Sequence, residues 1–353
     1  MIEIMWWNRL VNSVRFIEDI CDSLFDNKSV QLVFEGDIPW KETMLDTLEQ
    51  HLSEKTDSRK FEVIDASKII KPPGEYLMDK YCSPDERKKY WPTTHGSREY
   101  FLAQNDVTVL NNRYVCITGI SSGNIEKWVS SVGEYISNCS QDKDHGIFIL
   151  IIEQSTTLSS KYLNLFKYRN YVSDYDCMML CLTVISSLPC SRSQKMYICE
   201  VASNIADNRV EYAGLLAQAG LELIEDPFDT AQTVYIENGI ECSDLKENIK
   251  RAVWEAQIKL VFPKLENFRA GIIRKYDHKL IRYLPIKSSN NDIIKKPSDL
   301  EIGQLYYIVN NNRADKIIDS SEYEMLKKMK NARNTLAHWE PLSYEQLIAL
   351  ELM

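Results

Sequence analysis

Residues 146–153 most constrain how this chain can fold. Six apolar residues, Ile147 through Ile152, stand in a row between Gly146 and Glu153. A strand without polar residues is buried on both faces, which is typical of a parallel sheet covered by helices on both sides. This segment therefore predicts an α/β fold.

Other segments extend this pattern along the first two thirds of the chain. Candidate strands cover residues 30–35, 61–66, 114–118 and 178–186, with a short edge strand at 234–236. Candidate helices cover residues 10–24, 41–52, 125–137, 158–168 and 193–207. Helices between strands provide the crossovers that parallel pairing requires. We expect a parallel-sheet α/β domain over residues 1–240.

From residue 241 onward the sequence predicts helices alone, and we expect an all-α domain over residues 241–353. The expected helices cover residues 243–265, 266–283 and 298–310, a segment from 321 onward, and the C-terminal residues from 343. Ser243 is expected to cap the first helix. Capping boxes, in which a hydroxyl and a Glu or Gln side chain satisfy free helix-end amides, are expected at Ser298, Ser321 and Ser343.

Composition excludes several classes of protein. The chain is 44% hydrophobic and 26% charged, as folded globular proteins are, which excludes a disordered chain and a simple coiled coil. Its longest apolar stretch, from Cys177 to Cys190, is too short and too rich in Ser and Thr to cross a bilayer. We expect a cytoplasmic protein that does not contact membranes.

Cysteines and charges give two further expectations. The nine cysteines contain no Cys-x-x-Cys pair, so neither a disulfide framework nor a zinc site is expected. Residues 1–240 carry 23 basic and 35 acidic residues, whereas residues 241–353 carry 19 and 16. The two parts therefore differ in net charge, and only the second is slightly basic.

The turn after the first strand partly matches a phosphate-binding loop. Such a loop reads G-x-x-x-x-G-K-[S/T], because close backbone amides cradle phosphates, Lys neutralises them and the hydroxyl holds magnesium. Gly36 and Lys41 match this pattern in type and place. However, Trp40 replaces the second Gly, Glu42 replaces the hydroxyl residue, and the interval is one residue short.

Glu153 follows an apolar strand, as the acid of the second NTPase motif does, and Ser186-Ser187 would occupy a polar sensor position. Together with Lys41, these features resemble an AAA-like or STAND-type P-loop NTPase domain. Two interpretations remain: a structural sheet that has lost nucleotide binding, which we favour, or a competent NTPase that uses Lys41 and Glu153. Under the first, ATP and GTP bind more weakly than about millimolar.

The segment Asn331-Ala-Arg333-Asn334-Thr-Leu-Ala-His338 carries the second candidate site. It resembles the Arg-x4-His motif of the HEPN superfamily, all-helical domains that include metal-independent ribonucleases. The resemblance covers residues 241–353 and implies that Arg333, Asn334 and His338 are catalytic, without a cofactor. His exchanges protons near neutral pH and Arg stabilises phosphate charge. Alternatively, His338 only stabilises the helix dipole and Arg333 is only solvated.

Lys327, Lys328 and Lys330 precede this motif, and they either follow phosphates or form an ordinary solvated helix face. The resemblance implies a site shared by two subunits. We expect a homodimer through apolar positions of the C-terminal bundle, such as Leu326, Met329 and Leu336.

Two functional hypotheses follow. The first is an RNA-cleaving protein, of a bacterial defence or toxin type, whose degenerate NTPase-like domain regulates it or binds a protein partner. The second is a catalytically inactive adaptor that uses both domains for assembly.

Overall fold

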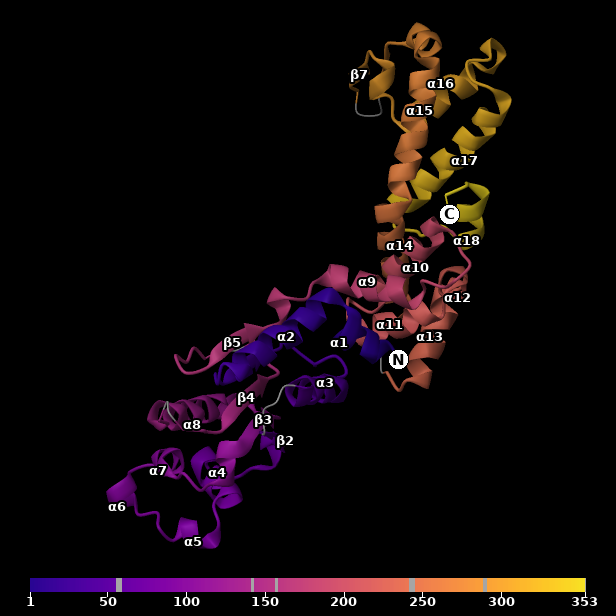
Figure 1. Ribbon diagram of the computed structural model, residues 1–353. Coiled ribbons are helices and arrows are strands. Elements are labelled where there is room, and N and C mark those ends of the chain that lie inside the picture. The colour runs from indigo at the N-terminus through magenta and orange to yellow at the C-terminus, as the bar shows by residue number, and fades with distance from the viewer. Residues whose placement is uncertain (55–58, 141–142, 156–157, 241–244, 288–290, 353) are drawn as a thin grey trace. The chain divides into compact units, whose positions relative to one another are not determined.

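The computed structural model describes residues 1–54, 59–140, 143–155, 158–240, 245–287 and 291–352 (Figure 1). The chain forms two compact units, Met1–Asp176 and Cys177–Met353, which we call the N-terminal and the C-terminal unit. The coarse expectation of a mixed α/β protein with a parallel sheet is confirmed.

The N-terminal unit is built on a five-stranded parallel sheet in the order β2-β3-β4-β1-β5. Its strands are β1 (Val30–Val33), β2 (Lys60–Asp65), β3 (Arg113–Thr118), β4 (Ile147–Ile152) and β5 (Asn164–Lys167). All six residues of β4 are fully buried, as their apolar run predicts. The first four strands lie where the sequence placed them.

Helices cover both faces of this sheet. The helices α1 (Ile2–Arg9), α2 (Val11–Phe25) and α3 (Lys41–Glu54) pack together on one face, where Phe16 of α2 meets Phe34 at the end of β1. The other face carries α4 (Pro73–Tyr81), α7 (Arg98–Gln104) and α8 (Ile125–Asn138), with the short α5 (Pro84–Arg87) and α6 (Pro92–His95) in the same connection. Alternate residues of β4, such as Phe148 and Leu150, enter the core beneath α8.

Two segments adopt the opposite of the expected structure. Residues 178–186, expected to be a strand, lie largely in helix α9 (Asp174–Val184). The buried residues Cys177, Leu180 and Cys181 recur with helical spacing, which a continuous apolar run conceals. Conversely, residues 158–168, expected to be a helix, contain β5, a half-exposed edge strand that pairs with β1.

The regular structure in the described part of the C-terminal unit is helical, apart from a small hairpin of β6 (Ile286–Lys287) and β7 (Ile293–Ile294). Its other helices are α10 (Arg192–Ile205), α11 (Val210–Gln218), α12 (Leu221–Glu225), α13 (Pro227–Glu237), α14 (Leu245–Leu260), α15 (Phe262–Leu280), α16 (Ile302–Asn311), α17 (Ser320–Ala337) and α18 (Tyr344–Ala349). The expected edge strand at 234–236 is part of α13.

The boundary expected between residues 240 and 241 falls inside this C-terminal unit. One buried cluster runs from Cys177 to Leu352, so α10 to α13 share a core with the helices that follow them. Gln257 of α14 donates hydrogen bonds to the Tyr197 hydroxyl on α10 at 2.7 Å and to the Leu342 carbonyl at 2.9 Å. Buried contacts between distant segments therefore place the boundary about sixty residues earlier.

Helix starts also differ in detail from expectation. The box at Ser343 forms with Gln346, but α16 starts after Glu301, which forms a box with Gln304, rather than at Ser298. Asp319, rather than Ser321, precedes α17. The expected cap at Ser243 lies outside the described residues.

The apolar residues expected at a dimer contact are buried inside the subunit itself. Leu326, Met329 and Leu336 are at most 5% exposed and pack in the core of their own unit. They are therefore not available as a contact surface between subunits. Within the described ranges, no helix has the length and apolar character needed to span a bilayer.

Candidate functional site

The first candidate site lies at the carboxyl edge of the sheet, where β1 and β4 are neighbours. After β1, the chain passes through α3 to β2, which lies at one edge of the sheet. After β4, the chain continues to β5, which lies at the opposite edge. Neighbouring strands with diverging connections form the crevice in which α/β proteins bind ligands. Lys41 and Glu153 follow these two strands.

Lys41 and Glu153 contact one another directly. The Lys41 amine donates a hydrogen bond to the Glu153 carboxylate, and the two side chains are 29% and 32% exposed. Both residues are candidates from their sequence positions, and the structure brings them together. In this arrangement the amine that would neutralise a phosphate is neutralised by the protein itself.

The turn between β1 and α3 is also held by the protein's own side chains. The Trp7 indole donates a hydrogen bond to the Pro39 carbonyl at 2.8 Å, and Ile38 is only 5% exposed. Trp40 adopts a positive φ of 43°, where a bulky side chain is unusual. This turn therefore presents an indole ring at the position where a phosphate-binding loop has glycine.

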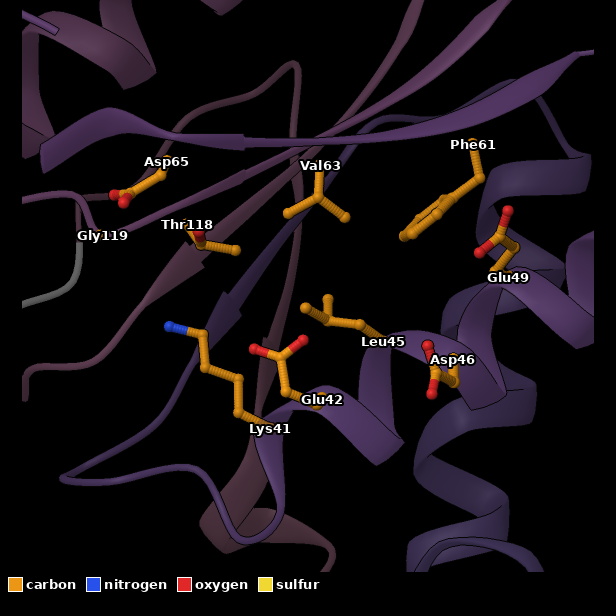
Figure 2. A pocket seen from close by; sticks show the side chains of 10 residues that line it. All are labelled: Lys41, Glu42, Leu45, Asp46, Glu49, Phe61, Val63, Asp65, Thr118 and Gly119. Carbon is orange, nitrogen blue, oxygen red and sulfur yellow. The ribbon is translucent and has the colours of Figure 1, made fainter. Parts of the chain in front are cut away.

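A cavity of about 350 Å³ lies beside Lys41, between α3 and the ends of β2 and β3 (Figure 2). Its polar lining is mostly acidic: Glu42, Asp46 and Glu49 come from α3, and Asp65 ends β2. Hydrogen bonds from the Ser67 hydroxyl, Lys68 and the Ser67 amide lower the pKa of Asp65 to about 2. The cavity therefore carries negative charge at neutral pH, which opposes phosphate binding.

Gly119, which lines the same cavity, lies so close to Asp65 that a larger residue would not fit there. Gly119 follows β3 with a φ of +66°, and a Cβ there would lie 2.4 Å from the Asp65 carboxylate oxygen. Neither residue is part of the expected site, although Asp65 lies near the end of the strand expected over residues 61–66. Ser186 and Ser187, expected to complete this site, follow helix α9 in the C-terminal unit and do not end a strand.

The second candidate site lies at the end of α17. His338 is the exposed C-cap residue, and its amide donates a hydrogen bond to the Asn334 carbonyl at 3.2 Å. Asn334 precedes His338 by one helical turn and shares its face. Arg333 precedes His338 by five residues, which separates the two by about 140° around the helix axis.

Arg333 faces the side of α17 that packs against the core. It lies seven residues after the fully buried Leu326, and its guanidinium pairs with the Glu301 carboxylate at 3.6 Å. The structure therefore brings Asn334 and His338 to one face and turns Arg333 toward α16. A cavity of about 210 Å³ between α17 and α18 is lined by Lys328, Thr335 and neighbours, and not by these three residues.

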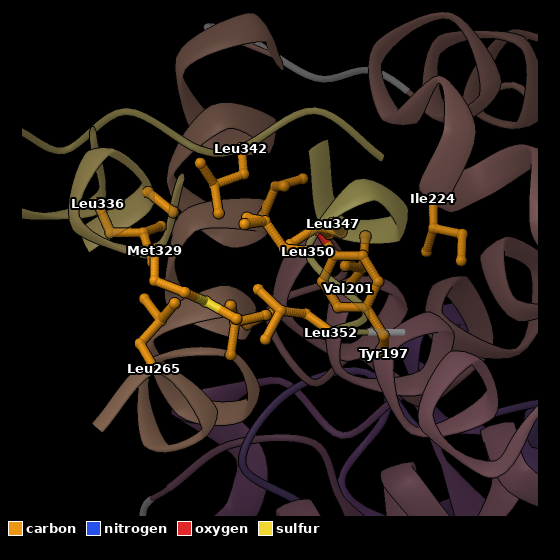
Figure 3. Close-up of a cluster of buried hydrophobic side chains, with 14 of the residues drawn as sticks. Tyr197, Val201, Ile224, Leu265, Met329, Leu336, Leu342, Leu347, Leu350 and Leu352 are labelled. Carbon is orange, nitrogen blue, oxygen red and sulfur yellow. The ribbon is translucent and has the colours of Figure 1, made fainter. Parts of the chain in front are cut away.

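Buried contacts fix the helix end that carries His338 (Figure 3). Leu336 and Leu342 flank this end and lie in the same buried cluster as Leu265. The Trp254 indole donates a hydrogen bond to the Leu336 carbonyl at 2.7 Å. Trp339 stacks on Trp254, with ring centroids 4.3 Å apart and ring planes at 14°.

No protein-family model matches this chain, and no curated protein matches its sequence. Across the described residues, no group of three or more His, Cys, Asp or Glu side chains is arranged to hold a metal ion.

Proposed function

We propose that this protein cleaves single-stranded RNA through the exposed end of α17, with His338 as the proton-transferring group. The observation that carries the proposal is the exposure of His338 on the same helix face as Asn334. The HEPN-like motif and a HEPN-like helical fold over residues 241–353 belong to this proposal.

The reaction follows from the chemistry of these groups. The RNA 2′-hydroxyl loses its proton and attacks the adjacent phosphorus, the bond to the 5′ oxygen breaks, and a proton moves to that leaving oxygen. His338 transfers a proton in this step, and Asn334 donates a hydrogen bond to the phosphate. A nearby cation stabilises the negative charge that develops on the phosphate in the transition state. The products are a cyclic phosphate and a 5′-hydroxyl, so the step consumes no nucleotide cofactor.

In this proposal the N-terminal unit is a degenerate P-loop NTPase-like domain. Its order of strands and the place of Lys41 support that likeness, while the Lys41–Glu153 ion pair and the acidic cavity argue against phosphate binding. We propose that it regulates cleavage or binds a protein partner of a bacterial defence or toxin system.

The test is incubation of the purified full-length protein with single-stranded RNA in EDTA. We expect fragments that end in a cyclic phosphate or a 3′-phosphate. The His338→Ala variant should cut about a hundredfold to ten-thousandfold more slowly. Intact RNA at high protein concentration, with the N-terminal unit's partner present, would contradict the proposal.

A catalytically inactive adaptor is the second candidate, and one observation favours it. Arg333 is held by Glu301 on another side of α17 from His338, so one copy of the chain does not place both side chains at one phosphate. An adaptor would leave RNA intact in the same assay. It would also tolerate His338→Ala without loss of binding to its partner.

A further inference from the structure

One face of α17 carries a continuous row of side chains suited to nucleic acid. Lys327, Lys330, Asn334 and His338 recur at intervals of three or four residues, which is the spacing of one helix face. They span about 80° around the axis and about 16 Å along it. We call these four residues the α17 row; Tyr323, one turn before them, is buried in the core.

Two cations contact stacked aromatic rings near the N-terminal end of this row. The Arg313 guanidinium lies 4.2 Å from the centre of the Tyr323 ring, and the Lys330 amine lies 5.3 Å from that of Tyr306. The two tyrosine rings stack at 5.9 Å, with planes at 25°. In the part of the chain that the structure describes, Arg313 and Lys330 thus contact ring faces. A cation over a ring face keeps its positive charge, which can also attract an anion.

The exposed ring of Trp339 lies at the other end of the α17 row, directly after His338. Trp339 is 64% exposed although one face of its ring stacks on Trp254. Trp254 is itself anchored to the Leu336 carbonyl, so the outer ring is held in place before any ligand binds. A rigid, exposed indole is a platform on which a base stacks at little cost in side-chain entropy.

We propose that the α17 row, with Arg313 and Trp339, is a binding track for a single-stranded RNA segment. The phosphates contact Arg313, Lys327 and Lys330, and a base stacks on Trp339 beside His338. Cationic rows flanked by stacking aromatic rings are how proteins hold single strands. This inference rests on the proposed function, because it assigns the substrate strand that would reach His338.

The neighbouring lysines provide a matched control. Lys328 is an exposed lysine of the same helix, but it points about 100° away from Lys327 and lines the cavity beneath α18. The probe is a fluorescent single-stranded 2′-O-methyl oligonucleotide, which lacks the attacking hydroxyl and stays intact. Anisotropy then measures binding separately from cleavage.

We expect Lys327→Gln to weaken binding and Lys328→Gln to leave it near the wild-type value. The dependence of log affinity on log salt should become shallower by roughly 0.7 for Lys327→Gln and roughly 1.4 for Lys327→Gln with Lys330→Gln. Equal affinities and salt slopes for the Lys327→Gln and Lys328→Gln variants would overturn the track. Lys327 and Lys328 are exposed, so these two single substitutions should leave the thermal denaturation midpoint unchanged.

Trp339 tests the stacking end of the track. Trp339→Ala should lower affinity roughly tenfold, and Trp339→Phe should retain most of it, because a phenyl ring also stacks on bases. Wild-type affinity for Trp339→Ala would overturn the stacking assignment. Equal affinity for DNA of the same sequence would overturn the assignment to RNA.

The outcomes separate this inference from the proposed function. If the 2′-O-methyl strand binds as described but natural RNA stays intact, the proposed cleavage is refuted and the proposed binding track is supported. If the wild type and the Lys327 and Trp339 variants cut natural RNA equally well, the proposed cleavage is supported and the proposed binding track is refuted.

Discussion

Lys41 and Glu153, 112 residues apart in sequence, form an ion pair at the carboxyl edge of the parallel sheet. They follow the neighbouring strands β1 and β4, whose connections leave in opposite directions. The position at which this kind of sheet binds ligands is thus occupied by the protein's own charges. The acidic cavity beside the pair, with Asp65 ionised, strengthens that conclusion.

The first prediction concerns nucleotides. ATP and GTP should bind more weakly than about millimolar, a free energy of only about −4 kcal/mol, because Lys41 is already paired and four carboxylates line the adjacent cavity. Isothermal titration calorimetry with and without magnesium measures this affinity. Micromolar, magnesium-dependent binding that Lys41→Ala abolishes would contradict it.

The second prediction concerns subunit assembly. Arg333 and His338 lie on different sides of α17, so a site that uses both takes them from two copies of a homodimer. Arg333→Ala and His338→Ala should each be inactive alone. A mixture of the two should recover roughly a quarter of wild-type activity, since one site in each mixed dimer is complete.

Light scattering across a concentration series is the control for this mixing experiment. Failure to recover activity although mixed dimers form would exclude a shared site, as would a monomer at tens of micromolar. Any dimer contact must use residues other than Leu326, Met329 and Leu336, which are buried in the core.

The third prediction concerns Gly119 and the stability of the N-terminal unit. Gly119→Ala should lower the free energy of unfolding by about 1–3 kcal/mol, because φ is +66° and the new Cβ would meet the Asp65 carboxylate. Gly123→Ala is the matched control, since its Cβ would enter open space. Urea denaturation compares the two, and equal stabilities would refute the steric argument.

The fourth prediction concerns alkaline pH. Complete burial in β3 raises the pKa of the Cys116 thiol to about 12, whereas an unfolded thiol has a pKa of about 8.5. Only the unfolded state therefore loses this proton between these two values. The thiol's contribution to stability is present below pH 8.5 and declines as pH rises, by up to about 1.4 kcal/mol per pH unit.

Cys116→Ala isolates this effect from the other groups that titrate at high pH. The variant should be less stable than the wild type by a constant amount below pH 8, because it leaves a cavity. That difference should shrink as pH rises above about 9. Denaturation across this range measures it, and a difference independent of pH would show that the thiol is accessible.

The pattern of neighbouring residues was sufficient to predict much of the fold. The apolar run of β4, the turn after β1 and the capping box at Ser343 are encoded by adjacent residues, and the structure has each of them in place. The pattern failed at residues 178–186, where continuous apolar character is equally compatible with a strand and a buried helix. The contacts of Cys177 with Ser203 on α10 and of Cys181 with the Ala213 carbonyl on α11 belong to the buried helix.

The candidate sites show the same division. Spacing alone placed Asn334 and His338 on one helix face, and strand order along the chain placed Lys41 and Glu153 at strand ends. Spacing did not show that Arg333 turns toward Glu301, because a partner 32 residues away decides its direction. The stack of Trp254 and Trp339 likewise joins residues that are distant in sequence.

The sequence by itself determined the class of fold, the parallel sheet and the residue types at both candidate sites, since these depend on apolar periodicity and neighbouring residues. Tertiary structure decided the division into units at Asp176 and Cys177. It also paired Lys41 with Glu153 and separated Arg333 from His338. The physical reason is that ion pairs, stacked rings and shared cores form between residues that only the folded chain brings together.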